Sequence, residues 1–315
     1  MGRLLAALGG QGTKVLFGGV FLGLLLPELA AVFRPALPYT VALLLLLSLL
    51  RVDWGEIGET VRRPLSVGLA TLWMMLVSPI VVWALLSLLP LPPALSTGLI
   101  LMAAAPPILG ATAIAILLGL DGALAVVVGL LATLLTPLTV PPLALALLGV
   151  SLEIGIAEFM LRLGAVVVVS FSAAFVVRRV AGTERLRAWG SRIDGIVVLL
   201  MLVFALAIMD GVTGALFERP RVVLLWLAAA FVANPLLQLL GALAFSWMGR
   251  RRALTAGLLS GNCNMGLLLA ALPPAADFDV VLFFALAQIP MYTLPAAVLP
   301  FYRRFLAADT AARRS

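Results

Sequence analysis

Five consecutive small or polar residues interrupt a strongly apolar stretch late in the chain. They are Ser260, Gly261, Asn262, Cys263 and Asn264, in the run LLSGNCNMGLLL. An asparagine amide offers two N–H donors and a carbonyl acceptor, and leaving such groups unpaired in an apolar medium is expensive. We therefore expect the two amides to face other polar groups, a wet cavity or a small solute.

A second interruption consists of two adjacent prolines, Pro106 and Pro107, in the middle of another apolar run. Proline has no backbone N–H, and its ring clashes with the carbonyl group four residues earlier. The carbonyl oxygens of Met102 and Ala103 are therefore predicted to lose their usual donors, and Gly110 adds backbone freedom nearby. Freed carbonyl groups suit a cation, and the N-terminus of a half-helix suits an anion.

Residue types that support enzyme chemistry are scarce in this sequence. It contains no histidine and a single cysteine, Cys263. The commonest general base and metal ligand are thus absent, and neither an internal disulfide nor a thiolate metal cluster is available. We find no Ser/His pair or carboxylate dyad, and we expect no enzyme, no metal centre and no cofactor.

The elements that must position the two interruptions are membrane-spanning helices. With 63% hydrophobic and 11% charged residues, the 315-residue chain is too apolar for a soluble domain. A helix needs about 20 residues to cross a bilayer, and ten runs of roughly that size predict an all-α polytopic membrane protein. The predicted spans are 14–33, 38–50, 65–89, 94–120, 122–150, 159–180, 193–210, 222–247, 253–272 and 280–303.

The positive charges sort to one set of span ends. The net charge of +7 therefore reflects membrane topology, and no nucleic-acid partner is expected. By the positive-inside rule, we predict a bacterial-type inner-membrane protein with both termini cytoplasmic. The opposite side receives only Arg34, Arg162, Arg219 and Arg221. The cytoplasmic set is Arg3, Lys14, Arg51, Arg62, Arg63, Arg178, Arg179, Arg185, Arg187, Arg192, Arg250, Arg251, Arg252, Arg303, Arg304, Arg313 and Arg314.

The two halves of the chain share unusual features at nearly one offset. The segment ALSTGLI at 94–100 matches ALTAGLL at 253–259, and Ser78-Pro79 matches Asn234-Pro235. Five spans per copy place the second copy in the opposite orientation, an arrangement typical of secondary transporters. We therefore divide the chain into repeats at 1–150 and 151–315. The further matches pair Asp121, Pro137 and Pro142 with Asp279, Pro295 and Pro300.

The stretch APPILGATAIAILLGLDGALA at 105–125, with Thr136-Pro137 and Pro141 downstream, resembles the bile acid/sodium symporter family. The resemblance covers most of the chain. It implies a core of spans three to five and eight to ten that rocks against a panel of spans one, two, six and seven. It also implies organic anions as substrates, such as bile salts, steroid sulfates and small carboxylates.

The sequence departs from the family at the residues that coordinate two sodium ions. Ala111 and Thr112 replace the family's Ser-Asn, and Ala125 and Gly129 replace hydroxyl-bearing residues of the fifth span. Sodium requires several oxygen ligands, so we expect weak or absent sodium coupling. The family's ninth-span pattern Glu-x-Gly-x-Gln-Asn is replaced by Leu259, Ser260, Gly261, Asn262, Cys263 and Asn264.

These patterns predict alternating-access transport of a small, anionic organic solute, with the solute and the lipid bilayer as partners. Two alternatives stay open: an efflux carrier resembling the auxin efflux carrier family, and a sensor or receptor derived from a transporter. The identity of the solute, its direction of travel and the oligomeric state are also left open. The predicted solute contacts are Thr112, Asn262 and Asn264, with Ser260 and Cys263 beside them. The residues predicted to shape the breaks are Pro106, Pro107, Gly110 and Gly261.

Overall fold

The computed structural model of the chain describes residues 12–52, 64–149, 155–273 and 276–312. Within these ranges every regular element is helical, apart from one isolated β-bridge. Six helical runs are long and apolar enough to cross a membrane, which confirms the all-α membrane class. The count of ten spans and the inverted repeat stay predictions. The six runs are Pro27–Arg51, Pro64–Leu86, Gly122–Leu148, Ile156–Ala181, Gly190–Glu218 and Pro220–Ala244.

Some sequence predictions fall outside the described residues. The boundary between the two repeats, at residues 150 and 151, is one of them. The charges concerned are Arg3, Arg62, Arg63, Arg313 and Arg314.

The first predicted span, 14–33, is not one continuous helix. Helix α2 (Gly12–Leu25) ends before Leu26, and α3 (Pro27–Phe33) begins at the next residue. Proline is favoured in the first turn of a helix because its missing N–H would have no helical partner there. Pro27 therefore starts a new helix within the predicted span.

The chain divides into two compact units, of which the first comprises Met1–Val52, Ala157–Leu225 and Gly266–Pro274. These segments contain the first, second, sixth and seventh predicted spans. The remaining helices of this unit are a short 3-10 helix (Arg34–Ala36), α4 (Leu37–Arg51), α11 (Ile156–Ala181), α12 (Thr183–Ala188), α13 (Gly190–Ile208) and α14 (Val212–Glu218).

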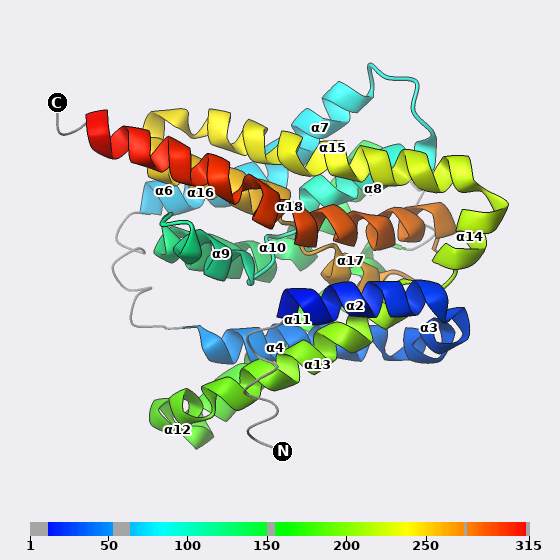
Figure 1. Ribbon diagram of the computed structural model, residues 1–315, viewed down its shortest axis with the longest axis horizontal. Coiled ribbons are helices and arrows are strands. Elements are labelled where there is room, and N and C mark those ends of the chain that lie inside the picture. Colours follow the sequence, from blue (N-terminus) through cyan, green and yellow to red (C-terminus); the bar gives the residue numbers. More distant parts are fainter. Residues whose placement is uncertain (1–11, 53–63, 150–154, 274–275, 313–315) are drawn as a thin grey trace. The chain divides into compact units, whose positions relative to one another are not determined.

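Helix α13 is the centre of the first unit and packs against α2, α3 and α4 (Figure 1). Glycines permit the close approach of α2: a Cβ on Gly19 would lie 2.9 Å from the Ala205 Cβ, and one on Gly23 would lie 2.8 Å from the Met209 Cβ. The apolar face of α13 therefore packs directly against the α2 backbone.

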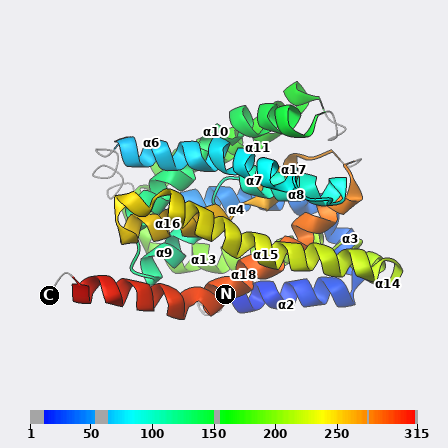
Figure 2. The ribbon, with the colours of Figure 1, turned by 90° about the horizontal axis from the view of Figure 1, so that it is seen from above.

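The second unit comprises Asp53–Ile156, Trp226–Met265 and Ala275–Ser315. Helices α7 and α8 pack side by side in it (Figure 2). Helices α15 (Pro220–Ala244) and α17 (Met265–Ala271) have residues in both units, and the first residue of α11, Ile156, also belongs to the second unit. The other helices of this unit are α6 (Pro64–Leu72), a π-helical turn (Trp73–Val77), α7 (Ser78–Leu86), α8 (Pro93–Ala104), α9 (Ala111–Leu117), α10 (Gly122–Leu148), a short 3-10 helix (Ser246–Met248), α16 (Arg250–Gly261) and α18 (Phe278–Ala312).

Candidate functional site

Two helices of the second unit are interrupted where the sequence contains the proline pair and the asparagine pair. Helix α8 ends at Ala104, and Ala105 is extended (φ −68°, ψ 142°) before α9 begins (Figure 1). Helix α16 ends at Gly261, and Asn262 leaves the helical region (φ −101°, ψ 71°). We call residues 105–110 the proline break and residues 262–264 the asparagine break.

The two breaks are joined by backbone hydrogen bonds. The Ile108 N–H donates to the Asn262 carbonyl oxygen at 2.8 Å, and the Asn264 N–H donates to the Pro106 carbonyl oxygen at 2.7 Å. These two bonds form an antiparallel bridge in which Pro107 lies opposite Cys263. Segments that leave their own helices thus satisfy each other's main chain, as a medium without water requires.

The end of α16 is capped by side chains of the asparagine break itself. The Asn262 side-chain amide donates to the Leu258 carbonyl oxygen at 2.7 Å, and the Cys263 thiol donates to the Ser260 carbonyl oxygen at 3.0 Å. Asn262 is 1% exposed and Cys263 is 2% exposed. The thiol therefore supplies a donor to the Ser260 carbonyl oxygen at the end of the helix, and the Asn262 side chain adds a second donor to the Leu258 carbonyl oxygen, which also accepts the Asn262 backbone N–H at 3.2 Å.

A buried chain of three side chains completes this cap from two other helices. The Asn234 amide of α15 donates to the Gly261 carbonyl oxygen at 2.7 Å, and its own oxygen accepts from the Gln238 amide at 2.7 Å. The Tyr302 hydroxyl of α18 donates to the Gln238 oxygen at 2.9 Å. We call Asn234, Gln238 and Tyr302 the amide relay. In the sequence, Asn234 stood out only as a repeat match, and Tyr302 gave no signal.

Ser260 also bonds to protein groups. Its hydroxyl donates to the Ala256 carbonyl oxygen at 2.9 Å and accepts from the Trp73 indole N–H at 3.1 Å. Trp73 opens the π-helical turn and packs edge-on against Phe245, with ring centroids 6.1 Å apart. Local π-helical turns are frequent at functional sites, and this one directs an indole toward the asparagine break.

The proline break has less polar support. Pro106 and Pro107 are buried, and Thr112 is half-buried in the first turn of α9. The Met102 carbonyl oxygen accepts the Ala105 N–H at 3.3 Å. Because Pro106 has no N–H, Met102 lacks its usual donor and shares the Ala105 N–H with the Leu101 carbonyl oxygen, which lies nearer at 2.9 Å.

The two glycines predicted to shape the breaks have different surroundings. A Cβ on Gly110 would meet nothing within 4 Å. A Cβ on Gly261 would collide with Gln238 and would lie 2.6 Å from the Asn234 carbonyl oxygen. Gly261 is therefore required by the close approach of α15, whereas nothing crowds Gly110.

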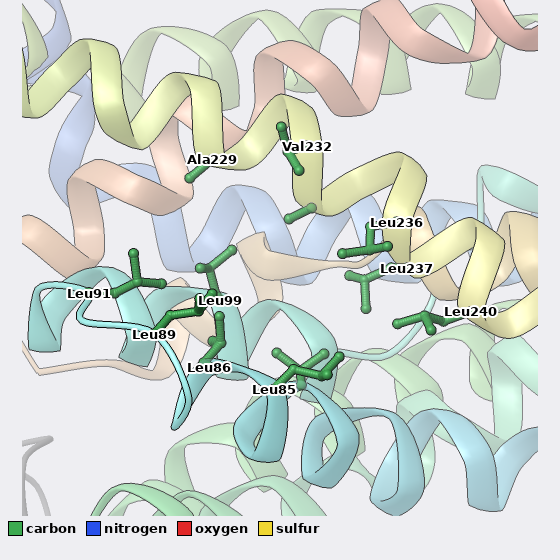
Figure 3. Close-up of a pocket in the computed structure, with 12 residues that line it drawn as sticks. Leu85, Leu86, Leu89, Leu91, Leu99, Ala229, Val232, Leu236, Leu237 and Leu240 are labelled. Atoms are coloured by element: carbon green, nitrogen blue, oxygen red, sulfur yellow. The ribbon is translucent and has the colours of Figure 1, made fainter.

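An apolar pocket of about 220 Å³ lies between α7, the turn that follows it, α8 and α15 (Figure 3). Leucine, valine and alanine side chains make up its lining, with Leu85 and Leu86 on α7 facing Leu236 and Leu237 on α15. This lining offers no partner to a charged group. The polar groups at the two breaks are therefore the better candidate site for an ionic solute.

The carboxylate nearest in sequence to the proline break serves a helix end. Asp121 Oδ1 accepts the Leu124 N–H at 3.0 Å at the start of α10, and Oδ2 lies 3.7 Å from Arg252 Nε. The Asp121 N–H donates to the Thr255 hydroxyl at 3.0 Å. This acidic group therefore fastens the α9–α10 turn to the start of α16.

Comparison with known families adds one finding. Residues 38–212, more than half of the chain, match the Sodium Bile acid symporter family. This range includes the proline break but not the asparagine break. No curated protein matches the chain.

Proposed function

Since the chain belongs to the sodium bile acid symporter family, we propose that it is a secondary transporter that carries a small organic anion by alternating access. The observation that carries this proposal is the pairing of two interrupted helices through the Ile108–Asn262 and Asn264–Pro106 bonds. Discontinuous helices near the bilayer midplane form the solute sites of many secondary transporters. The family membership and the paired breaks thus point to the same region.

Reciprocal packing supports the proposed inverted repeat. The repeat pairs α8 with α16 and α10 with α18. In the second unit, α8 packs against α18 and α16 packs against α10. Each interrupted helix therefore contacts the tenth or fifth span of the opposite repeat, as a two-fold relation requires. We propose ten spans in two inverted sets, with spans one, two, six and seven as the panel and spans three to five and eight to ten as the core.

Charges within the first unit support the proposed orientation in an inner membrane. Arg178 donates to the Leu50 and Val52 carbonyl oxygens at 3.0 and 3.1 Å, where the Arg51 Nε lies 2.8 Å from Asp194 Oδ1. This end carries the charges that we place in the cytoplasm together with both termini. The Arg34 Nη1 lies 3.3 Å from Asp210 Oδ2 just beyond the other end of α13, which we place on the opposite side of the membrane.

The residues at the breaks do not fit a sodium site. No acidic residue stands at 105–112 or 260–264, and sodium needs several oxygen ligands. The carbonyl oxygens of Pro106, Gly261 and Asn262 already accept hydrogen bonds. We therefore propose transport without sodium coupling, with Thr112, Asn262 and Asn264 as the polar contacts of the solute.

Counterflow in proteoliposomes tests the proposed transport. Radiolabelled bile salt, steroid sulfate and small carboxylate are offered separately, with sodium or with choline as the only external cation. We expect counterflow of at least one of these anions at the same rate in both media, and a loss of at least about tenfold in Asn264→Ala and Thr112→Ala. A strict sodium requirement would contradict uncoupled transport.

The same vesicles discriminate the two alternatives. Net movement only from the cytoplasmic face outward would identify an efflux carrier. Saturable binding without counterflow would identify a sensor or receptor and would remove the transport proposal.

A further inference from the structure

We propose that side-chain amides take the place of a bound cation at the end of α16, with Asn234 as the residue on which this replacement depends. The inference rests on the proposed transport function, because it explains how a member of a sodium symporter family could work without the ion. It assigns Asn234, Gln238 and Tyr302 as positioning residues of the solute site.

The carbonyl oxygens at the end of α16 attract hydrogen-bond donors and cations. The last carbonyl groups of a helix lack intrahelical donors and carry the negative end of the helix dipole. In lipid these groups must be satisfied by a cation, by protein donors or by trapped water. Here the Asn234 amide N–H meets the Gly261 carbonyl oxygen at 2.7 Å. The Asn262 amide N–H meets the Leu258 carbonyl oxygen at 2.7 Å, in addition to the Asn262 backbone N–H at 3.2 Å.

The amide relay fixes which end of the Asn234 amide faces the helix. The Asn234 oxygen accepts from the Gln238 amide nitrogen, and the Gln238 oxygen accepts from the Tyr302 hydroxyl. A flipped Asn234 amide would set oxygen against the Gly261 carbonyl oxygen and nitrogen against the Gln238 nitrogen. Both contacts would be repulsive, so the relay holds the N–H donor toward α16.

Burial keeps water away from the Asn234 amide. Asn234 is 0% exposed, so solvent cannot substitute for its N–H. Glycines bring α15 against α16: a Cβ on Gly257 or Gly261 would collide with Gln238, and one on Gly241 would collide with Ser260. The close packing leaves the Asn234 amide in direct contact with the carbonyl oxygen that an ion would otherwise bind.

A carboxylate in place of the Asn234 amide should create a site that binds a cation at the end of α16. Asn234→Asp removes the N–H donor and sets a carboxylate oxygen against the Gly261 carbonyl oxygen. Thermal unfolding of the purified full chain is measured at pH 8 in sodium chloride and in choline chloride of equal concentration. Gln288→Glu is the matched control, because Gln288 is also a buried amide of the second unit (1% exposed) and its N–H donates to the Phe284 carbonyl oxygen of its own helix.

We expect the wild-type midpoint to be the same in both salts. The Asn234→Asp midpoint should be lower in choline and should recover by about 3 °C or more in sodium. Gln288→Glu should be lowered equally in both salts. Asn262→Asp, which removes the second amide donor, is measured in the same way if Asn234→Asp does not fold, and it should show the same sodium-dependent recovery.

Two results would overturn the inference. One is a wild-type protein that sodium stabilises over choline, because a cation would then already bind. The other is a folded acidic variant whose midpoint does not depend on sodium. Neither readout requires a transported solute, so failure of the counterflow assay and failure of this inference are separate outcomes.

Discussion

The proline break and the asparagine break interrupt their helices through opposite chemistry. At the proline break, Pro106 and Pro107 remove two N–H donors, and the chain leaves α8 because it cannot continue as a helix. At the asparagine break, Asn262 and Asn234 add amide donors that cap α16 after it has ended. The prolines end α8 without a side-chain donor from another helix, whereas the cap of α16 depends on side chains of α15 and α18.

Removing the Asn234 amide should have the largest effect. Asn234→Leu leaves the Gly261 carbonyl oxygen and the Gln238 N–H without their partners. A buried polar group left unsatisfied costs about 1–3 kcal/mol, so we expect a loss of roughly 3 kcal/mol. Denaturant unfolding followed by tryptophan fluorescence measures it. The control is Ser78→Ala, at the repeat-matched position of α7, for which we expect less than half this loss. Equal losses would remove the contrast between the breaks.

The two glycines provide the next largest difference. Gly261→Ala sets a methyl group against the Asn234 carbonyl oxygen and Gln238, so α15 and α16 must separate. Overpacking of this kind costs about 1–3 kcal/mol. Gly110→Ala has open space, with φ −61° already helical, and should change stability by less than about 0.5 kcal/mol. Differential scanning calorimetry of both variants tests the ranking, and a Gly110 variant as damaged as the Gly261 variant would show that the proline break is equally crowded.

A smaller effect is expected at the far end of the amide relay. Tyr302→Phe removes only the hydroxyl that donates to the Gln238 oxygen at 2.9 Å, a loss of about 1 kcal/mol. The effect should shrink in a Gln238→Leu background, because the acceptor is then absent. A double-mutant cycle of unfolding free energies measures this coupling. Additive losses would mean that the relay is not one connected network.

Cys263→Ser should have the smallest effect of the four. The serine hydroxyl can donate to the Ser260 carbonyl oxygen as the thiol does at 3.0 Å. We expect a change below about 0.5 kcal/mol, checked by urea unfolding. A large loss would show that the thiol's size, and not its donor, holds the asparagine break.

The sequence predicted those parts of the site that depend on local chemistry. The two prolines indicate a helix end wherever they stand in an apolar run, and the two asparagines indicate a need for polar partners. The identity of those partners depends on tertiary structure. Asn234 and Tyr302 are 27 and 41 residues from Gly261 along the chain, and no local pattern pairs them with it.

The predicted roles of the break residues have also become more specific. Asn262 was predicted as a solute contact. Its side-chain N–H donates to the Leu258 carbonyl oxygen of α16, so the side-chain oxygen is the atom that we propose for that contact. Gly110 and Gly261 looked equivalent in the sequence, but only Gly261 lies against another helix. The split of the first span at Leu26 was open to prediction from Pro27, whereas the π-helical turn at Trp73–Val77 had no such signal.

The pairing of the two breaks can be measured directly with the chain's single cysteine. Pro107 lies opposite Cys263 in a bridge flanked by hydrogen bonds of the neighbouring residues, a pair type with Cα atoms about 4.5 Å apart, within disulfide range. Pro107→Cys should therefore form a disulfide with Cys263 on oxidation with iodine in membranes, seen as complete loss of both free thiols. Pro107→Cys in a Cys263→Ser background and Gly110→Cys with the native Cys263 should each keep their thiols free. Free thiols in oxidised Pro107→Cys, or equal closure from Gly110→Cys, would contradict the pairing on which the account depends.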